Sequence, residues 1–144
     1  MILVADTSGI IAAFDRNARE GPACRKAVQG AGTVILSPLV LAEVDHLARA
    51  RLGAAARTQI LELLSAQVQR TRFQVPVVGA ETLSTALTVI GHYADLDLDL
   101  ADAVTVALAA DYRTDAVLTL DRRDFRAVRP LTPHPAFRLF PDDL

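Results

Sequence analysis

The chain contains 144 residues, and 51% of them are hydrophobic, which is enough to bury one core. We therefore expect a single domain over residues 1–144. The 15 basic residues nearly balance the 17 acidic ones, so the net charge does not indicate a nucleic-acid-binding protein, and any basic surface must be local. The only cysteine, Cys24, excludes an internal disulfide and a multi-cysteine zinc site, which favours a cytoplasmic location.

The first half of the chain alternates short apolar runs with helical patterns. Its start lacks the basic stretch and long apolar region of a signal peptide, and its apolar runs are far shorter than the roughly 20 residues of a membrane span. We therefore expect a soluble protein without membrane contact. The predicted elements are a strand over residues 2–5, a helix capped by Thr7 or Ser8 and running through Phe14, a helix from Gly21-Pro22 through Val28, a strand over 34–36, and a helix from Ser37-Pro38 to about Arg51.

The second half of the chain continues this alternation. Its predicted elements are an amphipathic helix over 54–68, a strand over 73–78 with Pro76 at a sheet edge or bulge, helices over 81–93 and 100–112, and strands over 116–120 and 137–140. Strands that alternate with helices predict an α/β domain with a central, mainly parallel sheet of four to five strands, covered by helices on both faces. Ligands of such folds bind beyond the carboxyl ends of the strands.

Two carboxylates lie within apolar helical sequence. The predicted helix around Asp102 is apolar on nearly every side, so this residue is expected to be a charge in the core. Glu43 is likewise flanked by apolar residues. A buried carboxylate without a partner is costly or becomes neutral, so both residues need a partner. For Glu43, the alternative interpretation is a salt bridge or a capping role, with Arg49 and Arg51 following in the same predicted helix.

Two further acids follow predicted strands. Asp6 comes directly after the first strand and Asp121 after the strand over 116–120, and each, taken alone, is explained by a helix cap or a turn. Together with Glu43 and Asp102, they can converge on one edge of the sheet, where four carboxylates repel one another unless a cation joins them. Mg²⁺ and Mn²⁺ are the cations that prefer such oxygen ligands.

The same residues carry a resemblance to a known family. The chain resembles the PIN-domain family over essentially its whole length, and its layout is similar to that of the VapC toxins of bacterial type II toxin–antitoxin modules. No single motif is specific, but four occur in the family's order. These motifs are Asp6-Thr7-Ser8, Ala42-Glu43-Val44, Leu100-Ala101-Asp102-Ala103, and Thr119-Leu120-Asp121 with Asp124-Phe125.

This resemblance implies a fold, an activity and partners. The fold is a PIN-like three-layer α/β/α domain, and the activity is that of an endoribonuclease that hydrolyses RNA phosphodiester bonds with Mg²⁺, or Mn²⁺ in its place. Asp6, Glu43 and Asp102 match the three constant acids of the family. Asp121 matches the fourth, with Asp124 as an alternate metal ligand. The partners are the RNA substrate, a cognate antitoxin that covers the acidic site, and a second copy of the chain in a homodimer.

Several residues near the motifs have possible supporting roles. Asp99 is expected to cap the helix that contains Asp102. The hydroxyls of Thr7 or Ser8 and of Thr119 are candidates for orienting ligands. Local arginines are candidates for holding RNA phosphates, although a solvated charged loop explains them equally well; they are Arg122, Arg123, Arg126 and Arg129.

Two other functions compete with this interpretation. Phosphatases with an aspartate nucleophile after the first strand need a second aspartate two residues later, and Ser8 occupies that position here. A non-catalytic PIN-like scaffold that binds RNA or protein partners is the second alternative, and the presence of all four acids argues against it. The three histidines, His46, His92 and His134, lie outside the motifs, so no histidine chemistry is expected.

Overall fold

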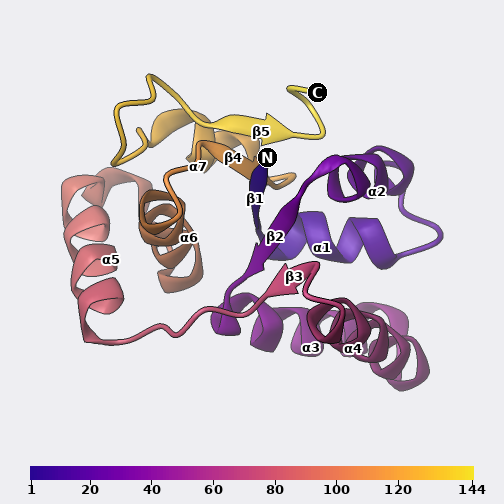
Figure 1. Cartoon of the computed structure of the whole chain (residues 1–144). Coiled ribbons are helices and arrows are strands. Elements are labelled where there is room, and N and C mark those ends of the chain that lie inside the picture. Colours follow the sequence, from indigo (N-terminus) through magenta and orange to yellow (C-terminus); the bar gives the residue numbers. More distant parts are fainter.

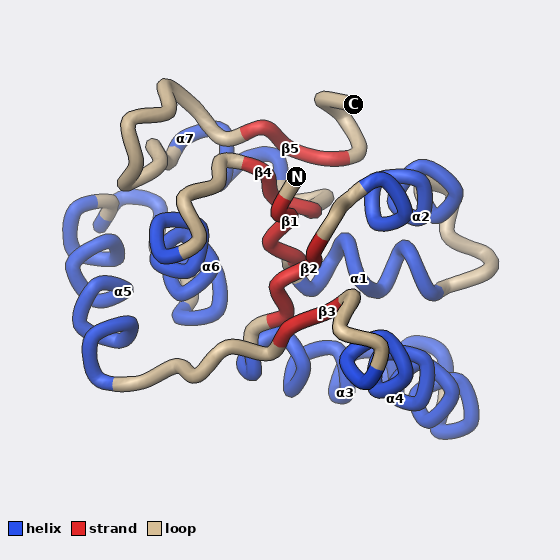
Figure 2. The backbone as a smooth tube through the Cα atoms, viewed as in Figure 1, coloured by secondary structure: helices blue, strands red, loops and turns tan.

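Five short strands lie side by side and parallel in the computed structural model, which describes residues 1–144. Figure 2 shows them as a column between two groups of helices. Their order in the sheet is β3-β2-β1-β4-β5, which confirms the predicted parallel α/β fold. The strands are β1 (Ile2–Ala5), β2 (Thr33–Leu36), β3 (Phe73–Gln74), β4 (Ala116–Leu118) and β5 (Arg138–Phe140).

Helices cover both faces of this sheet, as Figure 1 shows. One layer contains α1 (Thr7–Phe14), α2 (Gly21–Gly30), α3 (Pro38–Leu52) and α4 (Ala54–Gln69). The other contains α5 (Ala80–His92), α6 (Leu100–Asp111) and α7 (Arg122–Ala127), with a short 3-10 turn at Ala94–Leu96 between α5 and α6. None of these helices combines the length and hydrophobicity that a membrane span requires.

The core is divided between the two faces by the alternation of strand residues. In β1, Leu3 and Ala5 pack with the helices α1–α4, whereas Val4 packs with α5 and α6. The neighbouring strands alternate in the same way. Because both faces are covered, the strands can be apolar at every position, and this is why they appear as continuous hydrophobic runs in the sequence.

Two predicted strands were too long, and one helix was missed. The third strand ends at Gln74 instead of continuing to residue 78, and Val77 beyond Pro76 is 88% exposed, because proline has no N–H for the ladder. Strand β4 ends at Leu118 because the Leu120 N–H donates to the Ser8 hydroxyl rather than to a strand. Helix α7 was not predicted: it has six residues, too few for a helical periodicity to be visible in the sequence.

The sheet order places β1 beside β4, although about 110 residues separate them in the chain. From β1, the chain runs outward through β2 to β3, and its connecting helices lie on one face. It then returns through α5 and α6 on the other face to reach β4. Such a reversal opens a crevice at the carboxyl ends of the two central strands. Asp6 directly follows β1, and Thr119 directly follows β4, so both lie at this point.

The first prediction concerns Gly9, where α1 approaches β4 closely. A Cβ atom at this position would lie 2.6 Å from the Leu118 Cγ and 2.7 Å from the Leu118 carbonyl oxygen. We expect Gly9→Ala to lower the free energy of unfolding by about 1–3 kcal/mol, because the new methyl group overlaps with a strand. Urea denaturation measures this change.

Gly91→Ala is the matched control, since Gly91 is also helical and a Cβ atom added there would have no neighbour within 4 Å. This variant is expected to gain about 0.5–1 kcal/mol from the lower entropy of its unfolded chain. Equal unfolding free energies for the two variants would contradict the proposed contact.

Candidate active site

The four acids singled out by the sequence meet in one pocket. Asp6 follows β1, Glu43 lies in the second turn of α3, Asp102 in the first turn of α6, and Asp121 between β4 and α7. All four line a pocket of about 170 Å³, together with Asp99. The pocket lies at the carboxyl ends of β1 and β4, where the fold predicts a ligand site.

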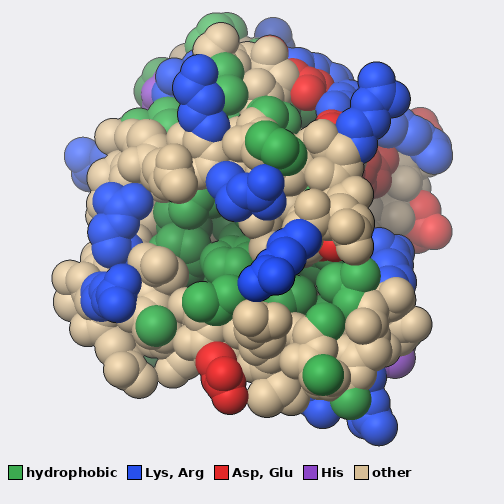
Figure 3. Space-filling view, turned by 90° about the vertical axis from the view of Figure 1, so that its right-hand side faces the viewer, with side chains coloured by type: hydrophobic (Ala, Val, Ile, Leu, Met, Phe, Trp, Pro, Cys, Tyr) green, Lys and Arg blue, Asp and Glu red, His purple; other side chains and the backbone are tan.

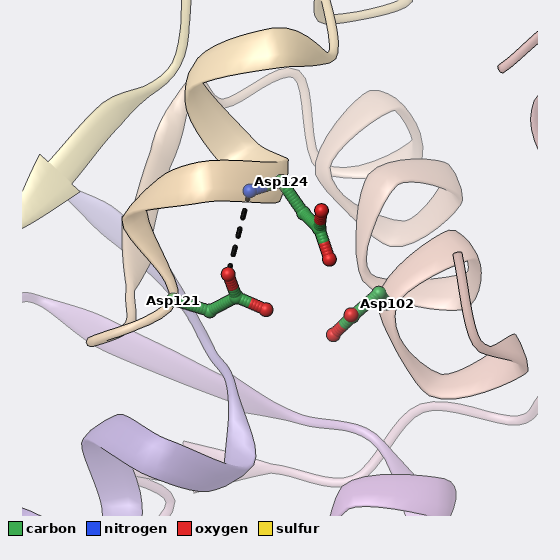
Figure 4. Close-up of side chains that lie close together, drawn as sticks. All are labelled: Asp102, Asp121 and Asp124. Atoms are coloured by element: carbon green, nitrogen blue, oxygen red, sulfur yellow. Dashed lines mark hydrogen bonds between the residues drawn. The ribbon is translucent and has the colours of Figure 1, made fainter. Parts of the chain in front are cut away.

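Asp102, Asp121 and Asp124 form the tightest group of carboxylates. Each offers one oxygen atom, and these oxygens all lie within 4.8 Å of one another. Figure 4 shows the three side chains converging on the same space from α6 and from the start of α7. Asp121 also caps α7, because its Oδ1 accepts a hydrogen bond from the Asp124 N–H at 3.3 Å. The structure therefore brings both candidates for the fourth acid into the cluster.

Two hydroxyl groups hold Asp6 in place. The Thr119 hydroxyl donates to Asp6 Oδ2 at 2.8 Å, and the Ser8 hydroxyl donates to the same oxygen at 3.3 Å. Thr119 Oγ1 in turn accepts from the Asp121 N–H at 2.9 Å, and Ser8 Oγ accepts from the Leu120 N–H at 2.9 Å. Thr119 thus connects the acids that follow the two central strands.

The expectation that Thr7 or Ser8 caps the first helix was wrong. Asp6 occupies the N-cap position of α1, but its side chain makes no capping hydrogen bond, so the alternative that Asp6 is a simple cap fails as well. Thr7 is the first residue of the helix, and its hydroxyl donates to Glu43 Oε2 at 3.4 Å. These side chains are engaged with acids of the pocket, because α1 begins inside the crevice.

Glu43 is less buried than its apolar neighbours in sequence suggested. Its side chain is half-buried, since only one side of α3 faces the sheet and the preceding Ala42 is exposed. It forms no salt bridge with Arg49 or Arg51, so the alternative interpretation of this residue is not found in the structure. Its position in the pocket, rather than its burial, distinguishes it.

Asp102 and Asp99 match their predictions more closely. Asp102 is 9% exposed and lies in a helix that is buried from Ala101 to Ala109. Asp99 caps this helix, because its Oδ1 accepts from the Asp102 N–H at 2.8 Å. Since Asp99 also lines the pocket, it contributes a further negative charge there.

Burial and mutual repulsion raise the pKa values of these acids. Burial, followed by the charges of Asp6 and Asp99, raises the pKa of Asp102 to about 8. Burial also raises the pKa of Asp6, against the opposing effect of the Thr119 hydrogen bond. Burial is also the main cause of the raised pKa of Glu43, and the charge of Asp99 is the second cause. The ionised cluster is therefore unfavourable without a positive charge.

The ligand atoms available in the pocket suit a hard divalent cation. They are carboxylate oxygens, and no histidine or cysteine lines the pocket. Carboxylate oxygens are preferred by Mg²⁺ and Mn²⁺, whereas Zn²⁺ sites usually contain nitrogen or sulfur ligands. A bound cation also removes the repulsion that raises the pKa values. The residues present thus fit the metal that the sequence predicted.

Of the four arginines that closely follow Asp121, two form ion pairs and two do not. Arg122 forms ion pairs with Glu20 and Asp142, and Arg126 pairs with Asp143. Arg123 and Arg129 form no ion pair. Two of the four arginines considered for RNA phosphates are thus already engaged by acids, mostly from the C-terminal segment, which the sequence alone could not place beside α7.

Arg51 is the basic residue that lines the acidic pocket, and sequence reasoning did not assign it to the substrate. The available signal was the spacing of four residues from Glu43 to Leu47 and from Leu47 to Arg51. This spacing repeats along one side of a helix, and all three residues line the pocket.

Comparisons with known proteins agree with the fold and identify the family. The family model described as PIN domain matches residues 3–130. Ribonuclease VapC26 of Mycobacterium tuberculosis is 34% identical over 130 residues, which cover 90% of this chain and 93% of that protein.

Solved structures with the same fold include VapC20 of M. tuberculosis, described as a Sarcin-Ricin loop cleaving toxin. It has a TM-score of 0.74 and 20% identity, and the match covers 87% of this chain and 93% of that one. A toxin–antitoxin complex from Klebsiella pneumoniae has a TM-score of 0.65 and 19% identity, with 92% of this chain and 98% of that chain covered. With a family model over most of its length and a close relative of nearly equal extent, this chain belongs to the PIN-domain family, as a VapC-type member.

Proposed function

We propose that this protein is a metal-dependent endoribonuclease that acts as the toxin of a type II toxin–antitoxin system. The observation that carries the proposal is the convergence of Asp102, Asp121 and Asp124 within 4.8 Å, in the pocket that Asp6 and Glu43 complete. Such a set of carboxylates suits phosphodiester hydrolysis with divalent ions. The similarity to a ribonuclease over nine-tenths of the chain supports RNA as the substrate.

In the proposed mechanism, the acids have different roles, which follow from their positions in the pocket. Asp102, Asp121 and Asp124 would hold a Mg²⁺ or Mn²⁺ ion, and Asp6 lines the same pocket with its Oδ2 fixed by Thr119. When bound, the ion activates water for in-line attack and neutralises charge on the leaving oxygen. Glu43 Oε2 accepts from Thr7, which leaves Oε1 free to orient the attacking water. The chain thus positions the reactants.

The alternatives differ from this proposal at defined residues. A phosphatase of the kind described above needs a second aspartate in place of Ser8, and here the Ser8 hydroxyl instead binds Asp6. A non-catalytic scaffold does not need a metal, so titration with Mn²⁺ followed by electron paramagnetic resonance separates it from an enzyme.

The second prediction tests the metal site with Asp102→Asn. Mg²⁺-dependent RNA cleavage should fall more than about 100-fold, since even the partners of metal ligands contribute 10–100-fold. Without metal, the variant should be more stable to urea than the parent, because asparagine carries no charge that burial and the neighbouring acids disfavour in the folded state. Asp111→Asn, an exposed position at the end of the same helix, is the control and should change neither quantity. Full activity of Asp102→Asn would refute the mechanism.

The third prediction is a pH dependence of stability. In the metal-free protein, the pKa of Asp102 is raised from 3.8 to about 8, so the folded state binds more protons than the unfolded state in this range. The free energy of unfolding in EDTA should therefore fall as the pH rises from 3.8 to about 8. Saturating Mg²⁺ should flatten this fall, because the ion stabilises the ionised acids. The same slope with and without Mg²⁺ would count against a metal at these acids.

For the antitoxin, the structure offers a groove at the far end of α1. Two adjoining pockets of about 410 and 270 Å³ share Phe14, Arg16 and Leu63 as lining residues. Figure 3 shows this side of the molecule, with hydrophobic side chains inside a hollow and basic side chains around it. Leu63 is 45% exposed, and Arg16 forms no ion pair. Apolar and acidic side chains of an antitoxin complement such a surface. The homodimer implied by the family stays a prediction.

The fourth prediction is that Leu63→Glu disrupts the complex with the cognate antitoxin. A carboxylate on the floor of the groove is desolvated by the partner, so affinity should fall at least about tenfold. Leu83→Glu on α5 is the control, because Leu83 is similarly exposed but lies in the helical layer on the other face of the sheet. Co-purification of toxin and antitoxin measures the effect. Equal retention of the antitoxin by both variants would exclude this groove.

A further inference from the structure

Arg51 is an unpaired guanidinium group at the edge of an acidic pocket. It lies in the last turn of α3 and is exposed, and it is the one basic residue among the ten that line the pocket. Five of the other lining residues are carboxylates. Even so, Arg51 forms no salt bridge and no side-chain hydrogen bond with any of them. A guanidinium group in this position is free to bind an anion from outside the chain.

Helix geometry explains why Arg51, and not its neighbour, faces the pocket. At 3.6 residues per turn, Leu47 and Arg51 follow Glu43 along one side of α3, and Arg51 lies about 12 Å from Glu43 along the helix axis. Arg49 points to the other side of the helix and lines none of the pockets. Two arginines of the same turn therefore differ in their access to the site.

The five carboxylates of the pocket repel a bound RNA strand, so a cation at the edge of the pocket favours its binding. A divalent ion held by the acids would offset their charge at the phosphate that is cut, but a neighbouring phosphate of the same strand would still be repelled by the carboxylates of Asp99 and Glu43. Arg122 and Arg126 are engaged in ion pairs with acids of the chain. Arg51 forms no ion pair and lies two turns of α3 beyond Glu43, at the edge of the pocket.

We propose that Arg51 binds an RNA phosphate adjacent to the one that is cleaved, and so directs the single strand across the acidic pocket. The proposal rests on the ribonuclease function proposed above. A guanidinium group suits this role because its planar donors bind phosphate oxygens in pairs. A phosphate contact carries no base specificity, so its contribution is the same for every RNA sequence.

The test compares Arg51→Ala, Arg51→Lys and the control Arg49→Ala. Binding of a short, labelled single-stranded RNA of randomised sequence is followed by fluorescence anisotropy at several salt concentrations, in Ca²⁺ instead of Mg²⁺ and with the RNA checked to be intact afterwards. We expect Arg51→Ala to weaken binding about tenfold and to make the plot of log affinity against log salt shallower by about 0.7, the value for one phosphate contact in a single strand. Arg51→Lys should keep the slope, and Arg49→Ala should match the parent protein.

Three results would overturn this role. The first is an unchanged slope in Arg51→Ala, and the second is an equal loss of RNA affinity in Arg49→Ala. The third is tighter Mn²⁺ binding by Arg51→Ala without any change in RNA affinity, which would make Arg51 only a counter-charge for the acids. Cleavage of total cellular RNA by the parent protein in Mg²⁺ is measured separately. Its absence would refute the ribonuclease proposal, whereas the binding comparison decides the role of Arg51 in either case.

Discussion

The functional site of this structure depends on one constraint, the burial of carboxylates that also repel one another. Asp6, Asp102, Asp121 and Asp124 come from three parts of the chain and are held together where water is partly excluded. In this position, the charged forms are disfavoured, as the raised pKa of Asp102 shows. The metal-free fold tolerates this cost because both faces of the sheet bury a large apolar core. A cation converts the same arrangement into a stabilising one.

Neutral hydrogen-bonding groups, rather than salt bridges, hold the acids. The hydroxyls of Thr119 and Ser8 donate hydrogen bonds to Asp6. Asp99 and Asp121 cap α6 and α7, and each accepts a hydrogen bond from a backbone N–H in the first turn of its helix. This choice has a physical consequence. Hydroxyl and amide donors orient a carboxylate without cancelling its charge, so the negative potential of the pocket is kept for a metal ion. An arginine paired with the same acids would occupy the place of the metal.

No arginine forms a salt bridge with the acids of the pocket. Arg122 and Arg126 attach α7 to the C-terminal residues and to Glu20, which fixes the element that carries Asp124. Arg138 pairs with Asp115 near the opposite ends of the strands. Arg16 and Arg51 stay unpaired, one in the groove at the far end of α1 and one at the pocket. Positive charge is thus available where an anionic partner is expected.

The sequence by itself determined the alternation of strands and helices, the buried helix around Asp102, and the acids that follow β1 and β4. These features depend on local hydrophobic periodicity, capping residues and the placement of charges, which a single chain segment contains. The tertiary structure decided the short third strand, the helix α7, the roles of Thr7 and Ser8, and the joint placement of Asp121 and Asp124. It also decided that Arg51 lines the acidic pocket, whereas Arg122 and Arg126 form ion pairs with acids elsewhere in the chain. The reason is physical: side-chain partners that lie more than 100 residues apart, such as Ser8 and Thr119, are brought together by the parallel pairing of β1 with β4, and no local pattern records that pairing.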